Sequence, residues 1–138
     1  MALQIRLTKN NDSRKNYRGK WFGRVVSTGE VDTRTLARNI SASNSVTESD
    51  VRAVIAALVV EMKHQMQDGK TVVLDDFGRF HLAVKSDMVD KEEDFNLKRH
   101  IRRIICHFTP AAHRNQMTRK LERDLCDGAD VVRWKYEE

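Results

Sequence analysis

The stretch Asp68-Gly-Lys-Thr-Val-Val-Leu-Asp-Asp-Phe-Gly-Arg-Phe80 decides how this chain is expected to fold. Gly69 stands where a helix is expected to stop, because glycine readily takes the left-handed conformation that ends many helices. Residues 71–74 and 79–84 are rich in β-branched and aromatic side chains, which predicts two short strands. Gly78 supplies the backbone freedom for a bend between them. The stretch therefore predicts a helix end followed by a hairpin.

A long amphipathic helix is expected to lead into this stretch. Thr47-Glu-Ser-Asp50 resembles a capping box, with an Asp at the third helical position instead of the usual Glu or Gln. Apolar side chains then recur at helical spacing on one face: Val51, Val54, Ile55, Leu58, Val59, Met62 and Met66. We expect a stripe this wide to pack on more than its own hairpin, which makes it a candidate dimer core.

A shorter helix and a second hairpin are predicted before the long helix. Residues 31–42 form the helix, which Asp32 or Thr33 can cap. The apolar face of this helix consists of Leu36, Ala37 and Ile40. Residues 3–9 alternate between apolar and polar types, and residues 21–26 have the composition of a strand. These two strands are expected to pair across a long polar loop.

The chain after the central hairpin is expected to complete the sheet. Residues 85–95 are acidic and predict a turn or protruding tip, and residues 96–108 predict a long basic strand. Alternation along this strand predicts two faces, with Ile104, Cys106 and Phe108 inward and Arg103, Ile105 and His107 outward.

The segment after this strand predicts one more helix. Thr109 suits the N-cap and Pro110 the first helical position, so the helix is expected to run to about Leu125. Its inward side chains are expected to be Met117 and Leu121. In the tail, residues 131–134 are expected to add a short strand or to cover a sheet edge.

Charge is distributed unevenly along the chain, whose net charge is +5. Residues 71–95 carry three basic and seven acidic side chains, whereas residues 96–120 carry seven basic and no acidic ones. Such segregation favours a polyanionic partner, because Lys and Arg contacts to phosphate release counterions. A solvated basic surface is the alternative interpretation.

Several functional classes are not expected. Two cysteines argue against a disulfide scaffold. The longest uncharged apolar run, residues 53–60, is too short to span a bilayer, and no signal peptide is recognisable. We therefore expect a soluble, cytoplasmic protein. Neither a phosphate-binding glycine loop nor a nucleophile elbow occurs, and the spacing of His100, Cys106, His107 and His113 does not suit a compact metal site. We expect no enzyme activity, cofactor or metal.

Three stretches together resemble the HU/IHF family of bacterial histone-like DNA-binding proteins. Val31–Met66 resembles the family's helical pair, and Leu74-Asp-Asp-Phe-Gly-Arg-Phe80 resembles its Phe-Gly-Thr-Phe or Phe-Gly-Ser-Phe hairpin. Phe108-Thr-Pro-Ala-Ala-His-Arg-Asn-Gln-Met117 resembles the return into the final helix. Residues 1–7 and 21–26 resemble the N-terminal extension of an HU-like subgroup that also has a C-terminal tail.

The resemblance implies an α+β fold and three segments. These are an N-terminal β extension (1–30), an HU/IHF-like DNA-binding domain (31–125) and a C-terminal tail (126–138). The implied domain is an intertwined homodimer, with a helical pair, a three-stranded antiparallel sheet with a β-arm, and a C-terminal helix. The N-terminal hairpin is an addition to this domain. The expected dimer core consists of Leu36, Ile40, Val51, Ile55, Leu58, Val59, Met62, Phe77 and Phe80.

The implied function is that of a nucleoid-associated protein. It would bind double-stranded DNA through the phosphate backbone, with low sequence specificity. The expected DNA-binding residues are Lys98, Arg99, Arg102, Arg103, Arg114, Arg119, Lys120, Arg79 and Lys85. The alternatives are a basic edge strand that resists aggregation for the first four, and a charged outer helix face for the next three.

The expected arm tip departs from the family pattern. DNA-bending members carry an Arg-Asn-Pro tip whose proline wedges between base steps. Here the one proline is Pro110, and the tip at Asp87–Asp94 has five acids and one lysine. We therefore expect weaker bending. An HU-like structural or protein-interaction module that has lost DNA bending, and an RNA-binding variant, remain alternatives.

The N-terminal extension leaves two interpretations open. Its basic loop, with Arg14, Lys15, Arg18 and Lys20, is either an added DNA-binding arm or a solvated loop. The aromatic residues Trp21, Trp134 and Tyr136 either stack on bases or cover the edge of a sheet.

Overall fold

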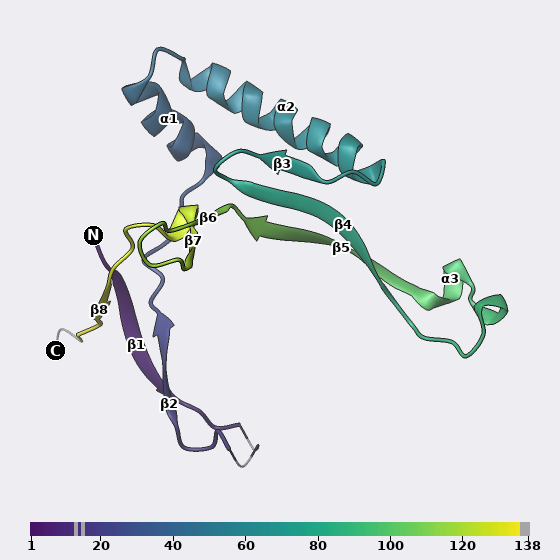
Figure 1. Cartoon of the computed structure of the whole chain (residues 1–138). Helices are drawn as coiled ribbons and strands as arrows, with labels where there is room; N and C mark the ends of the chain where they lie inside the picture. Colours follow the sequence, from purple (N-terminus) through teal and green to yellow (C-terminus); the bar gives the residue numbers. More distant parts are fainter. Residues whose placement is uncertain (13, 15, 136–138) are drawn as a thin grey trace. The chain divides into compact units, whose positions relative to one another are not determined.

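The computed structural model describes residues 1–12, 14 and 16–135. Contacts divide the chain into an N-terminal unit, Met1–Val31 with Cys126–Glu138, and a central unit, Asp32–Leu125 (Figure 1). The extension and the tail thus fold together. Within the described ranges, no helix is long and apolar enough to cross a lipid bilayer.

The N-terminal unit is a small sheet with the strand order β2-β1-β8. Strands β1 (Leu3–Lys9) and β2 (Trp21–Val25) pair antiparallel, as the alternation predicts. Strand β8 (Val131–Arg133) pairs parallel to β1, so the prediction that the tail adds a strand is confirmed.

The central unit begins with the predicted helical pair, α1 (Thr33–Ser43) and α2 (Glu48–Gln67). Asp32 caps α1 by accepting a hydrogen bond of 2.8 Å from the Thr35 amide. The capping box of α2 is confirmed, because the Asp50 amide donates to the Thr47 hydroxyl oxygen and the Thr47 amide donates to the Asp50 carboxylate. The hydrogen bond from the Thr47 hydroxyl lowers the pKa of the Asp50 carboxyl.

The predicted helix stop and hairpin are also confirmed. Gly69 has a φ of 80°, and its amide donates to the Met66 carbonyl at 3.0 Å, which closes α2. Strands β3 (Val72–Leu74) and β4 (Gly78–Ser86) then pair antiparallel. Gly78 has a φ of 155°, a value that side chains disfavour, and it lies at the bend between the strands.

Strand β5 (Ile101–Pro110) completes the sheet, whose order is β3-β4-β5. Its register pairs Phe80 with Phe108, and the two rings stack with centroids 4.7 Å apart. The same register pairs Leu82 with Cys106. A small apolar cavity lined by Leu82, Cys106 and α2 side chains shows that this face lies against α2. Cys106 therefore lies on the face toward α2, as predicted, but it is exposed, and Ile105, which was expected to face outward, is half-buried.

The predicted final helix is wrong. Thr109 and Pro110 continue β5, and strands β6 (Ala112–Arg114) and β7 (Leu121–Arg123) follow as a second hairpin before the 3-10 turn η2 (Asp124–Cys126). Pro110 is tolerated in β5 because this is an edge strand, where a missing amide costs little.

Local hydrogen bonds favour a turn in place of this helix. The Asn115 side chain accepts from the Met117 and Thr118 amides, and Arg119 adopts a φ of 58°. Asn commonly stabilises such turns, and a left-handed residue ends a helix. The expected inward packing is wrong as well, since Met117 is 95% and Leu121 61% exposed.

The start of the basic strand is another correction. Residues 92–94 form the 3-10 turn η1 (Glu92–Asp94), and the short helix α3 (Leu97–His100) precedes β5. The Asn96 side chain accepts from the Lys98 and Arg99 amides and so caps α3. Asn prefers such caps to strand positions, because its side chain can bond the nearby backbone.

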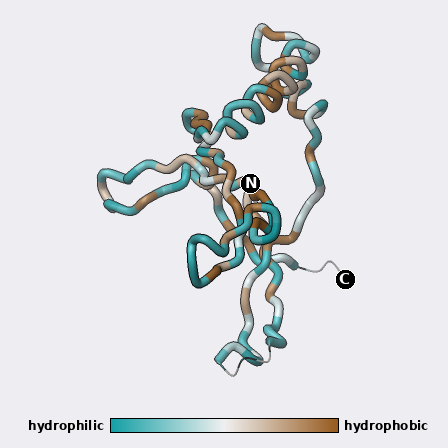
Figure 2. The backbone as a smooth tube through the Cα atoms, turned by 90° about the vertical axis from the view of Figure 1, so that its right-hand side faces the viewer, coloured by the Kyte–Doolittle hydropathy of each residue, from teal (hydrophilic) through white to brown (hydrophobic). Residues whose placement is uncertain are grey.

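One chain leaves much apolar surface uncovered. Of the hydrophobic side chains that the structure describes, only Ala37 is buried. Leu36 is 47% exposed and Val54 is 66% exposed. Figure 2 shows hydrophobic residues along the helical pair as well as in the sheet.

We predict that Gly78→Ala is far more damaging than Gly69→Ala. A Cβ at Gly78 would lie 2.5 Å from the Thr109 carbonyl oxygen and from the Phe108 ring, whereas a Cβ at Gly69 meets nothing within 4 Å. Denaturant unfolding should show a loss of roughly 2–5 kcal/mol for the first change and about 1–2 kcal/mol for the second. Equal losses of stability for the two changes would mean that the close approach of β4 to β5 does not require a glycine at position 78.

Candidate nucleic-acid interface

The outer part of the β4–β5 ladder projects beyond the helices as a β-arm, residues 84–104 (Figure 1). Val84 and Ile104 pair across the strands on the face that meets α2. They are nevertheless 55% and 67% exposed, because α2 does not extend over them. A register shift between Lys85 and Ser86 marks a bulge on the arm. Bulges bend a ribbon and increase its twist.

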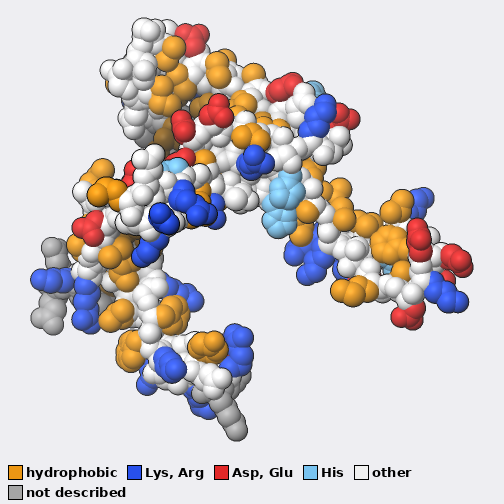
Figure 3. Space-filling model, in the orientation of Figure 1, with side chains coloured by type: hydrophobic (Ala, Val, Ile, Leu, Met, Phe, Trp, Pro, Cys, Tyr) orange, Lys and Arg blue, Asp and Glu red, His pale blue; other side chains and the backbone are white. Residues whose placement is uncertain are grey.

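The face of β4 and β5 directed away from α2 is basic. Alternation puts five side chains with positive or titratable groups on this face, which we call the open face: Arg79, His81, Lys85, Arg103 and His107. The predicted outward direction of Arg103 and His107 is confirmed. Neither strand contains an Asp or Glu. Figure 3 shows His side chains at the base of the arm, with Lys or Arg side chains beside them.

Two cross-strand pairs on the open face are unusual. Lys85 lies directly opposite Arg103, and His81 directly opposite His107 with the rings stacked 5.3 Å apart. Directly opposed like charges destabilise a sheet. Within the described part of the chain, no carboxylate forms an ion pair with Lys85 or Arg103. An anion between these side chains would relieve the repulsion.

The tip of the arm is locally folded. The Asp87 amide donates to the His100 carbonyl at 2.8 Å, and the Asn96 amide donates to His100 Nδ1 at 2.8 Å. Arg102 Nε donates to the Asp87 carboxylate at 2.5 Å, which raises the pKa of the Arg102 guanidinium. Arg102 is therefore held by a neighbouring acid and is less available to an external anion than Arg103.

The tip also mixes charges that the sequence separates. Helix α3 brings Lys98 and Arg99 next to the acidic residues of η1, and Figure 3 shows both signs at the end of the arm. Met88 and Leu97 are 100% and 73% exposed at this tip. The tip therefore differs from the purely basic open face.

The β6–β7 hairpin carries the remaining predicted cations. Arg114 ends β6, and Arg119 and Lys120 lie in the turn that precedes β7. The hairpin joins the sheet where the Ala111 amide donates to the Phe77 carbonyl at 3.1 Å. Figure 3 shows Lys and Arg side chains gathered over it. The structure thus distributes the predicted DNA-binding residues over an open face, a tip and a hairpin.

Sequence reasoning missed His81, which belongs to the open face. The signal that could have identified it is the pairing of Phe80 with Phe108, since this register sets His81 opposite His107. The expected dimer-core residues Phe77 and Phe80 pack with Phe108 in one aromatic cluster, and Phe77 is still 47% exposed.

Comparison with known families identifies the class of this protein. Residues 1–125 match HU-HIG, the family described as an HU domain fused to wHTH, Ig, or glycine-rich motif. The chain therefore belongs to the HU-HIG family of HU-like proteins. The match includes the N-terminal strands as well as the central unit. Among curated proteins, none matches this chain.

A solved structure shares the fold. It is a Bacteroides vulgatus protein described as a candidate bacterial DNA-binding protein, with a TM-score of 0.61 and 14% sequence identity. The similarity covers 97% of this chain and 50% of the other, so this chain spans about half the length of that protein.

We predict that Lys85→Glu stabilises the isolated protein. The change replaces a repulsive pair with Arg103 by an attractive one, which is worth about 0.5 kcal/mol for a cross-strand pair. Lys85→Gln should give a smaller gain, because it only removes the repulsion. Thermal or denaturant unfolding at low salt measures both, and a loss of stability with Lys85→Glu would contradict the assignment of an unpaired cationic face.

Proposed function

We propose that this chain is an HU-like, nucleoid-associated DNA-binding protein. It binds double-stranded DNA through phosphate contacts, with low sequence specificity, and it works without catalytic activity or a cofactor. The observation that carries the proposal is the open face, where Arg79, Lys85 and Arg103 project from strands without any carboxylate. DNA phosphates supply the missing counter-charge, and release of their condensed counterions drives the binding.

The length of the open face supports a duplex as the partner. The nine residues of β4 extend about 30 Å at 3.3–3.4 Å per residue, close to one helical turn of B-DNA. A two-stranded ribbon also fits the major groove. Arg79 and Lys85 are six residues apart, about 20 Å, and so reach different phosphates.

The composition of the strands supports low sequence specificity. Base pairs are commonly read by Asn or Gln on adenine and by Asp or Glu on cytosine. Strands β4 and β5 contain none of these four residue types. Arg and Lys side chains can also read guanine, but we assign these cations to phosphates, which position a protein without reading sequence. Family membership adds support, as does the description of the Bacteroides vulgatus protein as a candidate DNA-binding protein.

The functional form we propose is a homodimer in the bacterial cytoplasm, on the nucleoid. Leu36, Ile40 and Leu58 are 47%, 39% and 38% exposed in one chain, on the two helices whose apolar faces the sequence assigns to a core. A second copy is the simplest cover, because it offers the same apolar faces and gives a closed two-fold interface.

The arm tip favours a second candidate function, that of a protein-interaction module. Its mixed charges weaken attraction to phosphate, and its exposed Met88 and Leu97 suit a protein surface. An RNA duplex is a further alternative, since its phosphates present the same charge. Parallel titrations with DNA and RNA duplexes distinguish these partners.

We predict that replacing Arg79, Lys85 and Arg103 together with Ala flattens the salt dependence of duplex DNA binding. Each lost phosphate contact removes about 0.9 from the log–log slope, so the triple variant should lose about 2.7 per chain. Fluorescence anisotropy over a series of salt concentrations measures this slope.

A matched control for this prediction replaces Arg114, Arg119 and Lys120 with Ala. This variant removes the same charge from the β6–β7 hairpin, and the slope should change by much less. Equal salt slopes for the two variants would show that the open face is not the main DNA-binding surface. No duplex binding by the wild-type chain would favour the interaction module.

We predict that Leu58→Asp abolishes the folded dimer, because it would bury an unpaired charge in the interface. Val60→Asp is the control: it lies on the other side of α2, is 54% exposed, and should leave the dimer intact. Sedimentation equilibrium with circular dichroism measures both properties. A well-folded wild-type monomer would rule out the obligate dimer.

A further inference from the structure

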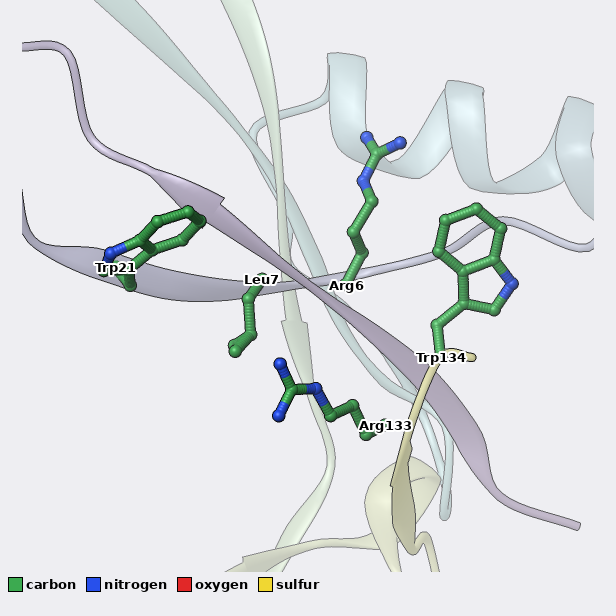
Figure 4. Close-up of a pocket in the computed structure, with 5 residues that line it drawn as sticks. All are labelled: Arg6, Leu7, Trp21, Arg133 and Trp134. Atoms are coloured by element: carbon green, nitrogen blue, oxygen red, sulfur yellow. The ribbon is translucent and has the colours of Figure 1, made fainter. Parts of the chain in front are cut away.

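The sheet of the N-terminal unit has two chemically different faces. One face is mainly apolar, with Leu3, Ile5, Leu7, Val25 and Val131, and it also carries the cations Lys9 and Arg133. The other carries two arginines and two aromatic rings: Arg6, Arg24, Phe22 and Trp134. We call this second surface the arginine–aromatic face. In Figure 4, Arg6 and Trp134 lie on one side of β1, whereas Leu7 and Arg133 lie on the other.

The rings of the arginine–aromatic face lie on the opposite side of the sheet from Leu3, Ile5 and Leu7. Alternation puts Phe22 on the opposite side of β2 from Val25, and the Trp134 amide continues the ladder by donating to the Ile5 carbonyl at 2.9 Å. Trp21, by contrast, pairs with Lys9 and belongs to the apolar face. Phe22, which is 37% exposed, therefore lies on the same side of the sheet as Arg6 and Arg24.

The two arginines form a cationic site without an acid. Arg6 lies directly opposite Arg24 across the β1–β2 ladder, and neither strand contains an Asp or Glu. Of the ion pairs formed by described residues, none involves Arg6 or Arg24. Two opposed guanidinium groups repel one another, and a phosphate between them would remove the repulsion.

Each arginine is also next to an aromatic ring. The guanidinium carbon of Arg24 lies 5.0 Å from the Phe22 ring centroid, and that of Arg6 lies 5.9 Å from the Trp134 ring. A nucleotide needs a cation for its phosphate and a flat surface for its base, and Arg24 with the Phe22 ring offers both. Base faces are accessible only when the base is unpaired, because a duplex stacks them internally.

The hairpin loop extends the cationic path beyond the sheet. The Asn10 amide donates to the Lys20 carbonyl, so the loop continues the β1–β2 ladder, and Arg18 and Lys20 are exposed on it. Arg14 is held by Asp12 at 2.6 Å and lies over the Tyr17 ring. Lys15 and Tyr136, which the sequence also suggests as contacts, lie outside the described residues.

We propose that the N-terminal unit binds single-stranded nucleic acid across its arginine–aromatic face. The phosphate backbone is held between Arg6 and Arg24, and unpaired bases stack on Phe22 and beside Trp134. This activity is separate from duplex binding by the β-arm and does not depend on it. The two sources of a single strand, DNA and RNA, share the chemistry that this face recognises.

Binding of the full chain to labelled oligothymidylate and oligouridylate tests the proposal. Phe22→Leu keeps the apolar volume but removes the ring, and it should weaken binding about tenfold. Phe22→Tyr keeps a ring and should bind as the wild type does. The double variant Arg6→Gln/Arg24→Gln should lose binding and salt dependence together.

Two controls separate this surface from others. Lys9→Gln/Arg133→Gln removes the same charge from the apolar face and should leave single-strand binding nearly unchanged. The variant with Arg79, Lys85 and Arg103 replaced by Ala should retain it as well, whatever its effect on duplex DNA. Three results would overturn the proposal. The first is a folded Phe22→Leu variant that binds the oligonucleotides as the wild type does, and the second is an equal loss of affinity in the two double variants. The third is duplex DNA that competes for the chain as well as a single strand does.

Discussion

The arrangement of the central unit depends on one close backbone approach, that of Gly78 to the end of β5. The Thr109 carbonyl and the Phe108 ring occupy the space that any side chain at position 78 would need. Because β4 begins at this contact, it fixes the register that pairs Phe80 with Phe108. A slip of one residue would exchange the two faces of the ladder, and Lys85 would then point toward the helices. The open face therefore exists because a glycine holds the strands in this register.

Much of the fold was predictable because its signals are local. The capping box at Thr47, the helix stop at Gly69 and the bend at Gly78 each depend on a few neighbouring residues. The final helix could not be excluded in this way, because Thr-Pro suits a helix start and the end of an edge strand equally well. What decides between them is the pairing of Pro110 with Gly78, a contact between residues far apart in sequence. The turn-forming residue Asn115 is a local signal that favours the β6–β7 hairpin over a helix.

The candidate site was predictable in composition but not in arrangement. A block of cations without acids indicates an anionic partner, yet it does not say which cations share a surface. The register places Lys85 opposite Arg103, while a single hydrogen bond assigns Arg102 to Asp87 and so away from that surface. The helical preference of residues 97–100, set by the Asn96 cap, moved two more cations to the tip. The strand register, one side-chain hydrogen bond and one helix cap decide which cations share a surface, and composition alone predicts none of the three.

The two three-stranded sheets of this chain share one electrostatic feature and differ in another. Each places two cations directly opposite one another without a carboxylate, Lys85 with Arg103 in one and Arg6 with Arg24 in the other. Such a pair costs a few tenths of a kcal/mol up to about 1 kcal/mol, so a sheet selected for stability alone would replace one member with an acid. The arginines of the N-terminal sheet are flanked by Phe22 and Trp134, whereas no aromatic ring of a described residue lies over Lys85 or Arg103. Charge alone suits the outside of a duplex, and charge beside an aromatic ring suits a strand whose bases are unpaired.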